Sequence, residues 1–310
     1  MGTDSTRHRT ADGELGALHR RATAHFGDLV HTIGPGQWVL PTPCAEWTVR
    51  DLVNHVTAEN LWMPPLLSGA LIADVGDRFD GDVLGDDPIA AWDAAATQAL
   101  AALDDPDVMA RTVHLSFGDS PADEYVRQLL ADHVVHAWDL AQAIDADDHL
   151  DDALVAACTE WFDSVEHTYR RAGAIGPREA VAPDADAQQR LLARFGRSAT
   201  RFVIERFTAA FNAHDVDAVM RLMTDDCVFE STGPAPDGRR FDGQEQVRAC
   251  WQELFDGTPS ARFDLEELVA VEARAVARWV HHWDGGHVRG VDVFTVRDGK
   301  VAAKRSYVKG

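Results

Sequence analysis

The sequence has few basic residues, few cysteines and no long apolar run, and each shortage excludes a class of protein. Lys and Arg number 29 against 51 Asp and Glu, which gives a formal net charge of −22 over 310 residues. Nucleic acids and anionic membranes attract basic patches, so we expect neither as a partner. No apolar run approaches the roughly 20 residues that span a bilayer. A small-molecule substrate remains as the expected partner.

The four cysteines, Cys44, Cys158, Cys227 and Cys250, lie far apart and form no C-x-x-C pair. The spacing therefore predicts neither a disulfide framework nor a thiolate zinc site, and it favours a reducing, cytoplasmic location. Residues 1–12 are polar, without the hydrophobic core of a signal peptide, and we expect them to be disordered.

The hydrophobic period changes near Gly196-Arg197, which predicts two domains, 13–197 and 198–310. Helical spacing dominates the first domain, and amphipathic helices open the second before alternating segments that are typical of strands. The expected helices are 13–33, 48–62, 88–103, 121–145, 150–172, 198–223 (broken near 212–215) and 244–256. The expected strands are 227–231, 262–272, 274–283, 287–297 and 300–308. We expect an all-α bundle followed by an α+β domain with an antiparallel sheet.

Asp132 and His136 stand four residues apart in a helical pattern, on the stripe that also carries apolar side chains. A buried carboxylate needs a partner or a metal. Thr48 and Asp51 form a predicted capping box that opens an earlier helix and places His55 on its inner stripe. Three such ligands from two helices suit an open, catalytic divalent site. The alternative is an Asp–His pair that satisfies itself in the core.

These segments resemble a known family. The run P-C-x-x-W-x-V-R-D-L-x-x-H over 43–55, Phe117-Gly118-Asp119, D-x-x-x-H-x-W-D-L-A from Asp132, and residues 190–197 are similar to actinobacterial DinB-like metal-binding proteins. These are related to the N-terminal domain of mycothiol-dependent maleylpyruvate isomerase. The resemblance implies a divalent metal, expected to be zinc, held by His55, Asp132 and His136, with Asp132 where the isomerase has Glu. It also implies a low-molecular-weight thiol as cosubstrate.

The C-terminal part resembles the SnoaL-like branch of the nuclear transport factor 2-like (NTF2-like) fold, a cone that also houses ketosteroid isomerase. The resemblance covers about 200–310 and is carried by residues 211–215, 233–238, 243–248 and 289–301. This fold hosts isomerases, cyclases, dehydratases and binding proteins, so it does not name a reaction.

A two-residue turn at Asp298-Gly299 sets a strand register. It pairs Arg297 with Lys300, Val296 with Val301, Phe294 with Ala303, and Asp292 with Arg305. Because the face of Phe294 and Val296 is the more apolar one, Asp292 and Arg305 are predicted to point into the cone. A turn at Gly285-Gly286 would place Trp279 beside Asp292 and His281 beside Gly290.

The register predicts a pocket with Asp292 as the candidate base and His281 or Tyr307 as the hydrogen-bond donor. Trp251, Trp279 and Arg305 are its other expected lining residues. The alternative is a buried Asp292–Arg305 ion pair that fixes the sheet, with Trp251 and Tyr307 in the core or at the rim.

Three functions remain open from the sequence. The first is a metal-dependent enzyme whose site in the bundle activates a thiol or a water, with Glu59 and Asp139 orienting the histidines. It would act as a thiol-dependent isomerase or transferase. The second is an isomerase or cyclase with its chemistry in the cone. The third is a small-molecule binding protein without catalysis.

The outer face of the predicted sheet carries β-branched residues. Side chains alternate between the two faces of a strand. The residues predicted on the face opposite Asp292 are Val276, Val280, Val291, Val293 and Thr295. A stripe of this kind is seldom left uncovered in a monomer. We therefore expect a homodimer through the C-terminal domains, the alternative being a monomer whose bundle covers this face.

Overall fold

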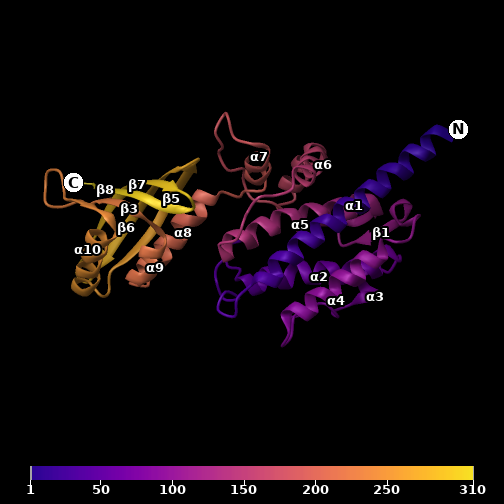
Figure 1. Cartoon of the computed structure of the whole chain (residues 1–310), viewed down its shortest axis with the longest axis horizontal. Coiled ribbons are helices and arrows are strands. Elements are labelled where there is room, and N and C mark those ends of the chain that lie inside the picture. Colours follow the sequence, from indigo (N-terminus) through magenta and orange to yellow (C-terminus); the bar gives the residue numbers. More distant parts are fainter. Residues whose placement is uncertain (1, 310) are drawn as a thin grey trace. The chain divides into compact units, whose positions relative to one another are not determined.

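The computed structural model describes the backbone of residues 2–309 and the side chains of residues 13–309. It divides into two compact units, Met1–Ile175 and Gly176–Gly310, which are described separately (Figure 1). The boundary after Ile175 lies earlier in the chain than the predicted one near Gly196-Arg197. The helix α7 (Ala187–Arg194) therefore belongs to the second unit.

The first unit is a helical bundle built around α5 (Ala122–Ile144), which packs against α1, α2 and α6. The apolar positions of α5 recur on nearly every side of the helix, so most of its residues from Tyr125 onward are buried. Its other elements are α1 (Gly2–Thr32), α2 (Val49–Leu67), α3 (Ile72–Val75), α4 (Pro88–Ala102), the 3₁₀ turn η1 (Val108–Ala110), β1 (Thr112–Leu115), β2 (Gly118–Pro121) and α6 (Asp152–Arg171).

The start of α2 follows from a local hydrogen-bond exchange. The backbone N–H of Asp51 donates to Thr48 Oγ1 at 3.3 Å, and the Thr48 N–H donates to Asp51 Oδ2 at 2.9 Å. This capping box is the predicted one, and it satisfies two backbone donors that a helix N-terminus leaves free. It fixes which face of α2 turns inward and therefore where His55 points.

Two features of the first unit differ from expectation. The antiparallel pair β1–β2 was not predicted, because four-residue strands are too short to show an alternating pattern. The structure also extends α1 back to Gly2, whereas we expected residues 1–12 to be disordered. That segment contains no proline, and extending an existing helix is far easier than nucleating one.

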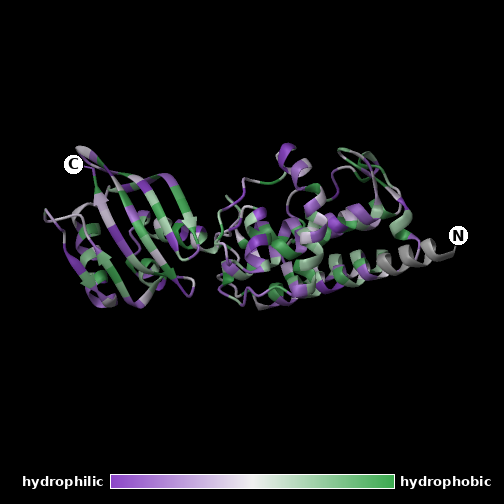
Figure 2. Ribbon diagram, turned by 90° about the horizontal axis from the view of Figure 1, so that it is seen from above, coloured by the Kyte–Doolittle hydropathy of each residue, from purple (hydrophilic) through white to green (hydrophobic). Residues whose placement is uncertain are grey.

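The second unit is an α+β cone whose curved sheet has the strand order β4-β3-β8-β7-β6-β5. Only the β3–β8 pairing is parallel among these. The strands are β3 (Met223–Glu230), β4 (Arg240–Asp242), β5 (Arg262–Val271), β6 (Arg274–Trp283), β7 (Gly286–Arg297) and β8 (Lys300–Val308), and the remaining helices are α8 (Ala199–Asn212), α9 (Val216–Arg221) and α10 (Gly243–Gly257). Figure 2 shows hydrophobic and hydrophilic bands alternating along these strands.

The helices α8 and α10 pack on the inner face of this sheet and enclose an aromatic core. Phe207 of α8 meets Trp251 of α10 and Phe294 of β7 edge to face, with ring centroids 5.6 and 5.8 Å apart. Edge-to-face contacts of this kind add to the stabilisation from burial alone. The predicted pocket residue Trp251 is fully buried in this core and lines no cavity that we find among the described residues.

A β-bulge in β8 shifts the register that the sequence predicted. The turn pairs Arg297 with Lys300 and Val296 with Val301, as expected, but Thr295 then stands opposite Ala303, so Ala302 is the extra residue. One inserted residue turns every later side chain to the opposite face. As a result Asp292 stands opposite Ser306, and the predicted Asp292–Arg305 pairing is wrong.

Candidate metal site and C-terminal pocket

Three side chains from α2 and α5 converge as the sequence predicted. His55 Nε2 lies 3.2 Å from Asp132 Oδ2, and His136 Nε2 lies 3.2 Å from Asp132 Oδ1. Their ligand atoms all lie within 4.8 Å of one another. The four-residue spacing on α5 places the carboxylate and one imidazole on a single helix face, and α2 supplies the second imidazole from across the bundle.

The cluster fits a divalent cation by the chemistry of its atoms. Asp132 Oδ2 is buried and has no hydrogen-bond partner, although an imidazole nitrogen lies 3.2 Å away. Two imidazole nitrogens and one carboxylate oxygen form a common donor set for zinc in catalytic sites. A cation among these atoms would satisfy this carboxylate oxygen, which His55 approaches without making a hydrogen bond.

Asp139 orients His136 through the ring nitrogen that does not face Asp132. Its carboxylate is fully buried and its Oδ2 lies 2.9 Å from His136 Nδ1. A carboxylate only accepts hydrogen bonds, so this contact places an imidazole proton on Nδ1, while Nε2 faces Asp132. The thiol of Cys44 donates to the same oxygen at 3.2 Å. The orienting role expected of Asp139 agrees with this geometry, whereas the contribution of Cys44 was not anticipated.

The ionisation of the cluster follows from burial and from its opposite charges. Burial would raise the pKa of Asp132, but His136 and His55 outweigh it and hold that pKa well below its usual range. Burial would likewise lower the pKa of His136, yet Asp132 raises it well above 6.5. For Glu59, burial and then the charge of Asp132 raise the pKa to about 7. A carboxyl with that pKa exchanges protons at neutral pH.

Two aromatic residues complete the surroundings, and sequence reasoning assigned neither to the site. Trp47 lies beside both histidines, with ring centroids 5.0 Å from His55 and 5.8 Å from His136. Tyr125 is buried on α5, about two helical turns before Asp132, and its hydroxyl has no hydrogen-bond partner among the described residues. Burial, with the charges of Glu59 and Asp132, raises the pKa of Tyr125. The position of Tyr125 on the inward-facing stripe of α5 was the only sign in the sequence that it lies near the site. The same position is typical of a core residue.

The second unit holds a pocket between α8 and the inner face of the sheet. Asp292 forms an ion pair with Lys304, with Asp292 Oδ2 2.7 Å from Lys304 Nζ, and both side chains are buried. Lys304 also donates to Ser306 Oγ at 2.7 Å. Aromatic and apolar side chains surround the pair: Phe207, Phe211, Phe263, Leu265, Ala277, Trp279 and Phe294.

Two buried polar atoms of this pocket lack hydrogen-bond partners among the described residues, Asp292 Oδ1 and Trp279 Nε1. The indole packs against Gly290, where an added Cβ would come within 2.3 Å of the ring. The free space measures about 20 Å³, which is enough for roughly one water molecule. One small apolar cavity is therefore lined by a hydrogen-bond acceptor, a donor and an ammonium group, which belong to Asp292, Trp279 and Lys304.

The other predicted pocket residues lie elsewhere. Arg305 faces away from the cavity and contacts Glu230 at 3.3 Å, because of the bulge. Tyr307 stands opposite Val291 on the outer face and is 56% exposed. His281 stacks on Phe263 with a centroid distance of 4.2 Å but does not line the cavity, and burial, followed by His282 and Lys304, lowers its pKa. Trp279 does line the cavity, but it stands opposite Gly290 and not Asp292. His281 stands opposite Val288 and not Gly290, so both predicted pairings are wrong.

Comparison with known proteins assigns both parts of the chain. Residues 19–141 match the mycothiol maleylpyruvate isomerase N-terminal domain, and residues 204–304 match the SnoaL-like domain. An uncharacterized protein of Mycobacterium tuberculosis strain H37Rv is 33% identical over 136 residues, which cover 44% of this chain and 70% of that protein.

Two solved structures illustrate the likeness of the second unit. An NTF2-like protein of unknown function from Mesorhizobium loti is 35% identical, and the match covers 42% of this chain and 99% of that one, with a TM-score of 0.35. A putative ketosteroid isomerase from Kribbella flavida is 17% identical, with coverage of 36% and 78% and a TM-score of 0.32.

The fold and the clustered ligands define a two-domain class, a DinB-like helical bundle followed by an NTF2-like cone. The chain belongs, through its first unit, to the mycothiol maleylpyruvate isomerase N-terminal family and, through its second, to the SnoaL-like family. Among the described residues, no helix is long and apolar enough to cross a membrane.

Proposed function

We propose that this protein is a zinc-dependent enzyme whose site in the first unit acts on a small organic molecule with a low-molecular-weight thiol as cosubstrate. The observation that carries the proposal is the convergence of His55, Asp132 and His136 around a buried carboxylate oxygen that has no hydrogen-bond partner. A bound Zn²⁺ would lower the pKa of a coordinated thiol or water toward neutrality.

The protein's own groups then have separate tasks. Asp139 keeps the proton on His136 Nδ1, which holds the imidazole in the orientation that presents Nε2. Glu59, with a pKa of about 7, can accept or release a proton beside the site at neutral pH. Trp47 excludes water from one side of the two histidines.

The reaction class follows from the family. In isomerisation a thiolate adds to an activated double bond, the resulting single bond rotates, and the thiolate leaves as the double bond re-forms. In thiol transfer the C–S bond remains and the neighbouring carbon takes up a proton, so both reactions fit this arrangement. Maleylpyruvate with mycothiol is the first substrate pair to assay, because the matching domain family carries that name. Such a reaction would take place in the cytoplasm, where low-molecular-weight thiols are kept reduced.

Elemental analysis of the purified full chain tests the metal. We expect about one zinc per chain in the wild type and loss of most of it in His136→Ala. His149→Ala is the matched control, because His149 is exposed and lies outside the cluster. Full zinc occupancy in a folded His136→Ala variant would refute the ligand assignment.

A second candidate function has its own observation, the unpartnered Asp292 Oδ1 and Trp279 Nε1 in one apolar cavity. There Asp292 would abstract a proton next to a carbonyl, while Lys304 and Trp279 would stabilise the resulting oxyanion. Activity that survives chelation of the metal but is lost in Asp292→Asn supports this function over the first. The opposite pattern rejects it.

Assembly is the remaining part of the proposal: two copies pair through the outer face of the sheet. Val269 and Val276 stand opposite each other there and are 50% and 45% exposed. Val291, Val293 and Thr295 are half-buried beside them. Val280 was expected in this exposed stripe but is only 5% exposed, so it contributes little to the contact.

A further inference from the structure

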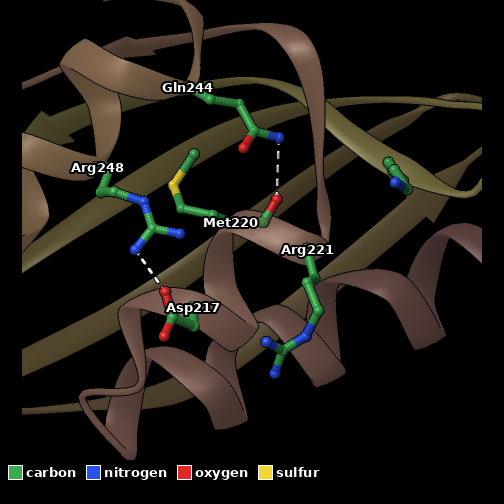
Figure 3. A pocket seen from close by; sticks show the side chains of 6 residues that line it. Asp217, Met220, Arg221, Gln244 and Arg248 are labelled. Atoms are coloured by element: carbon green, nitrogen blue, oxygen red, sulfur yellow. Dashed lines mark hydrogen bonds and ion pairs between the residues drawn. The ribbon is translucent and has the colours of Figure 1, made fainter.

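A hollow of about 290 Å³ lies between α9, α10 and the start of β8 (Figure 3). It is separate from the Asp292 cavity, because the two share none of their lining residues. Its walls are Asp217, Met220 and Arg221 from α9, Gln244 and Arg248 from α10, and Lys300 from β8. The volume is near the lower end of the range for small-molecule sites.

The charge of this hollow is opposite to that of the chain. Three cations and one carboxylate line it, in a protein with a formal net charge of −22. Many arginines elsewhere are held by carboxylates, for example Arg50 by Asp82, Arg111 by Asp105, Arg262 by Asp264 and Arg297 by Asp226. Here Arg248 takes Asp217, whereas Arg221 and Lys300 have no carboxylate partner among the described residues.

Asp217 pairs with Arg248 of another helix and not with Arg221 of its own helix. Asp217 stands one helical turn before Arg221 on α9, the spacing at which an acid and a base ordinarily pair. Figure 3 shows its carboxylate bonded instead to Arg248 of α10, while the Arg221 guanidinium extends without such a bond. Arg221 and Lys300 are both exposed, so an anion from solution can reach them.

Hydrogen bonds hold the three cation-bearing elements in place. Gln244 Nε2 donates to the backbone oxygens of Met220 at 3.2 Å and Met223 at 3.1 Å, which joins the start of α10 to the end of α9 (Figure 3). The Val301 N–H donates to Leu222 O at 2.8 Å and joins β8 to the same point. The backbones that carry the three cations are therefore fixed, and an anion in the hollow would compensate the charges of Arg221 and Lys300.

We propose that this hollow binds the phosphate group of a small molecule. The cations come from three different elements, which suits a tetrahedral oxyanion that accepts hydrogen bonds in several directions. A planar carboxylate would be satisfied by a single arginine fork. This inference is independent of the zinc proposal, since it concerns other residues in the other unit.

Calorimetric titration of the full chain with anions at fixed ionic strength tests the proposal. Inorganic phosphate and pyrophosphate are the probes, and acetate and malonate are the carboxylate arms. We expect saturable binding of pyrophosphate and phosphate, weakened at least about tenfold in Arg221→Gln/Lys300→Gln, as expected for the loss of charge-assisted hydrogen bonds. Arg274→Gln is the control, because Arg274 is exposed and lies outside the hollow; it should bind as the wild type does.

Equal pyrophosphate affinity in the double variant would overturn the proposal, as would malonate binding as tightly as pyrophosphate. Thermal unfolding gives an independent readout. Pyrophosphate should raise the Tm of the wild type and of Arg274→Gln but not that of the double variant. Without ligand the double variant should melt close to the wild type, because both side chains are exposed. If it melts much lower, the cations serve the fold and the proposal fails.

Discussion

The carboxylate of Asp292 and the ammonium of Lys304 form a buried ion pair, 2.7 Å apart, between neighbouring strands of the C-terminal sheet. The pair lies between the rings of Phe229 and Phe294, with Lys304 Nζ 5.2 and 5.8 Å from their centroids. Water therefore has little access to either charge, and each depends on the other for compensation.

Removing one member of this pair should be much more damaging than removing both. Lys304→Met leaves the Asp292 charge buried and alone, and we expect a loss of about 3–5 kcal/mol in the stability of the second unit. Asp292→Asn/Lys304→Met should recover much of that loss. Hydrogen exchange of the β7 and β8 amides measures the effect in this unit alone. Equal protection in Lys304→Met and wild type would show that the pair is not the buried charge that we describe.

Asp139→Asn should weaken zinc binding by about 10- to 100-fold without removing a ligand, because the amide can present its N–H₂ to His136 Nδ1 and favour the wrong tautomer. Competition with a chromogenic chelator measures the affinity. Asp147→Asn, at an exposed position outside the cluster, serves as the control. Unchanged affinity in Asp139→Asn would remove Asp139 from the site.

His19 should make the first unit sensitive to acid. The ring is fully buried, neither nitrogen has a hydrogen-bond partner, and burial followed by the charge of His133 lowers its pKa well below 6.5. The folded state therefore keeps His19 neutral while the unfolded chain binds a proton, so stability is lost as the pH falls below about 6.5, by at most about 1.4 kcal/mol per pH unit.

Urea unfolding between pH 7 and pH 5 measures this dependence. His19→Leu has a similar size and removes the two unpartnered nitrogens, so we expect a variant that is more stable and has a shallower loss with acid. The same pH slope in His19→Leu and wild type would assign the acid sensitivity to other groups.

The extent to which the sequence predicted this structure depended on the length of each pattern. His55, Asp132 and His136 could be placed because a capping box and a four-residue spacing settle the inward face of a helix. The strand side chains depended on counting from one turn, and the bulge at Ala302, for which we find no signal in the sequence, put Lys304 in the place expected for Arg305. Cys44 joins the site through tertiary packing, which its local sequence does not encode.

Assembly can be tested by light scattering. If two copies pair through the outer sheet face, the full chain at micromolar concentration should have twice its 34.0 kDa chain mass. Val293→Glu should reduce it to the single-chain mass, since a charge would enter the apolar contact. Glu245→Gln, at an exposed position of α10, is the control. A monomeric wild type would refute the dimer.

Anomalous diffraction from crystals of the zinc-loaded protein, recorded on both sides of the zinc absorption edge, tests the central claim most directly. We predict one strong peak among His55 Nε2, Asp132 and His136 Nε2, with at least one position open to solvent or substrate. The structure contains a second group of possible ligands, Cys44, Asp139 and His136 Nδ1, that offers an alternative location. A peak there, or the absence of a peak in the first unit, would contradict the proposed metal site.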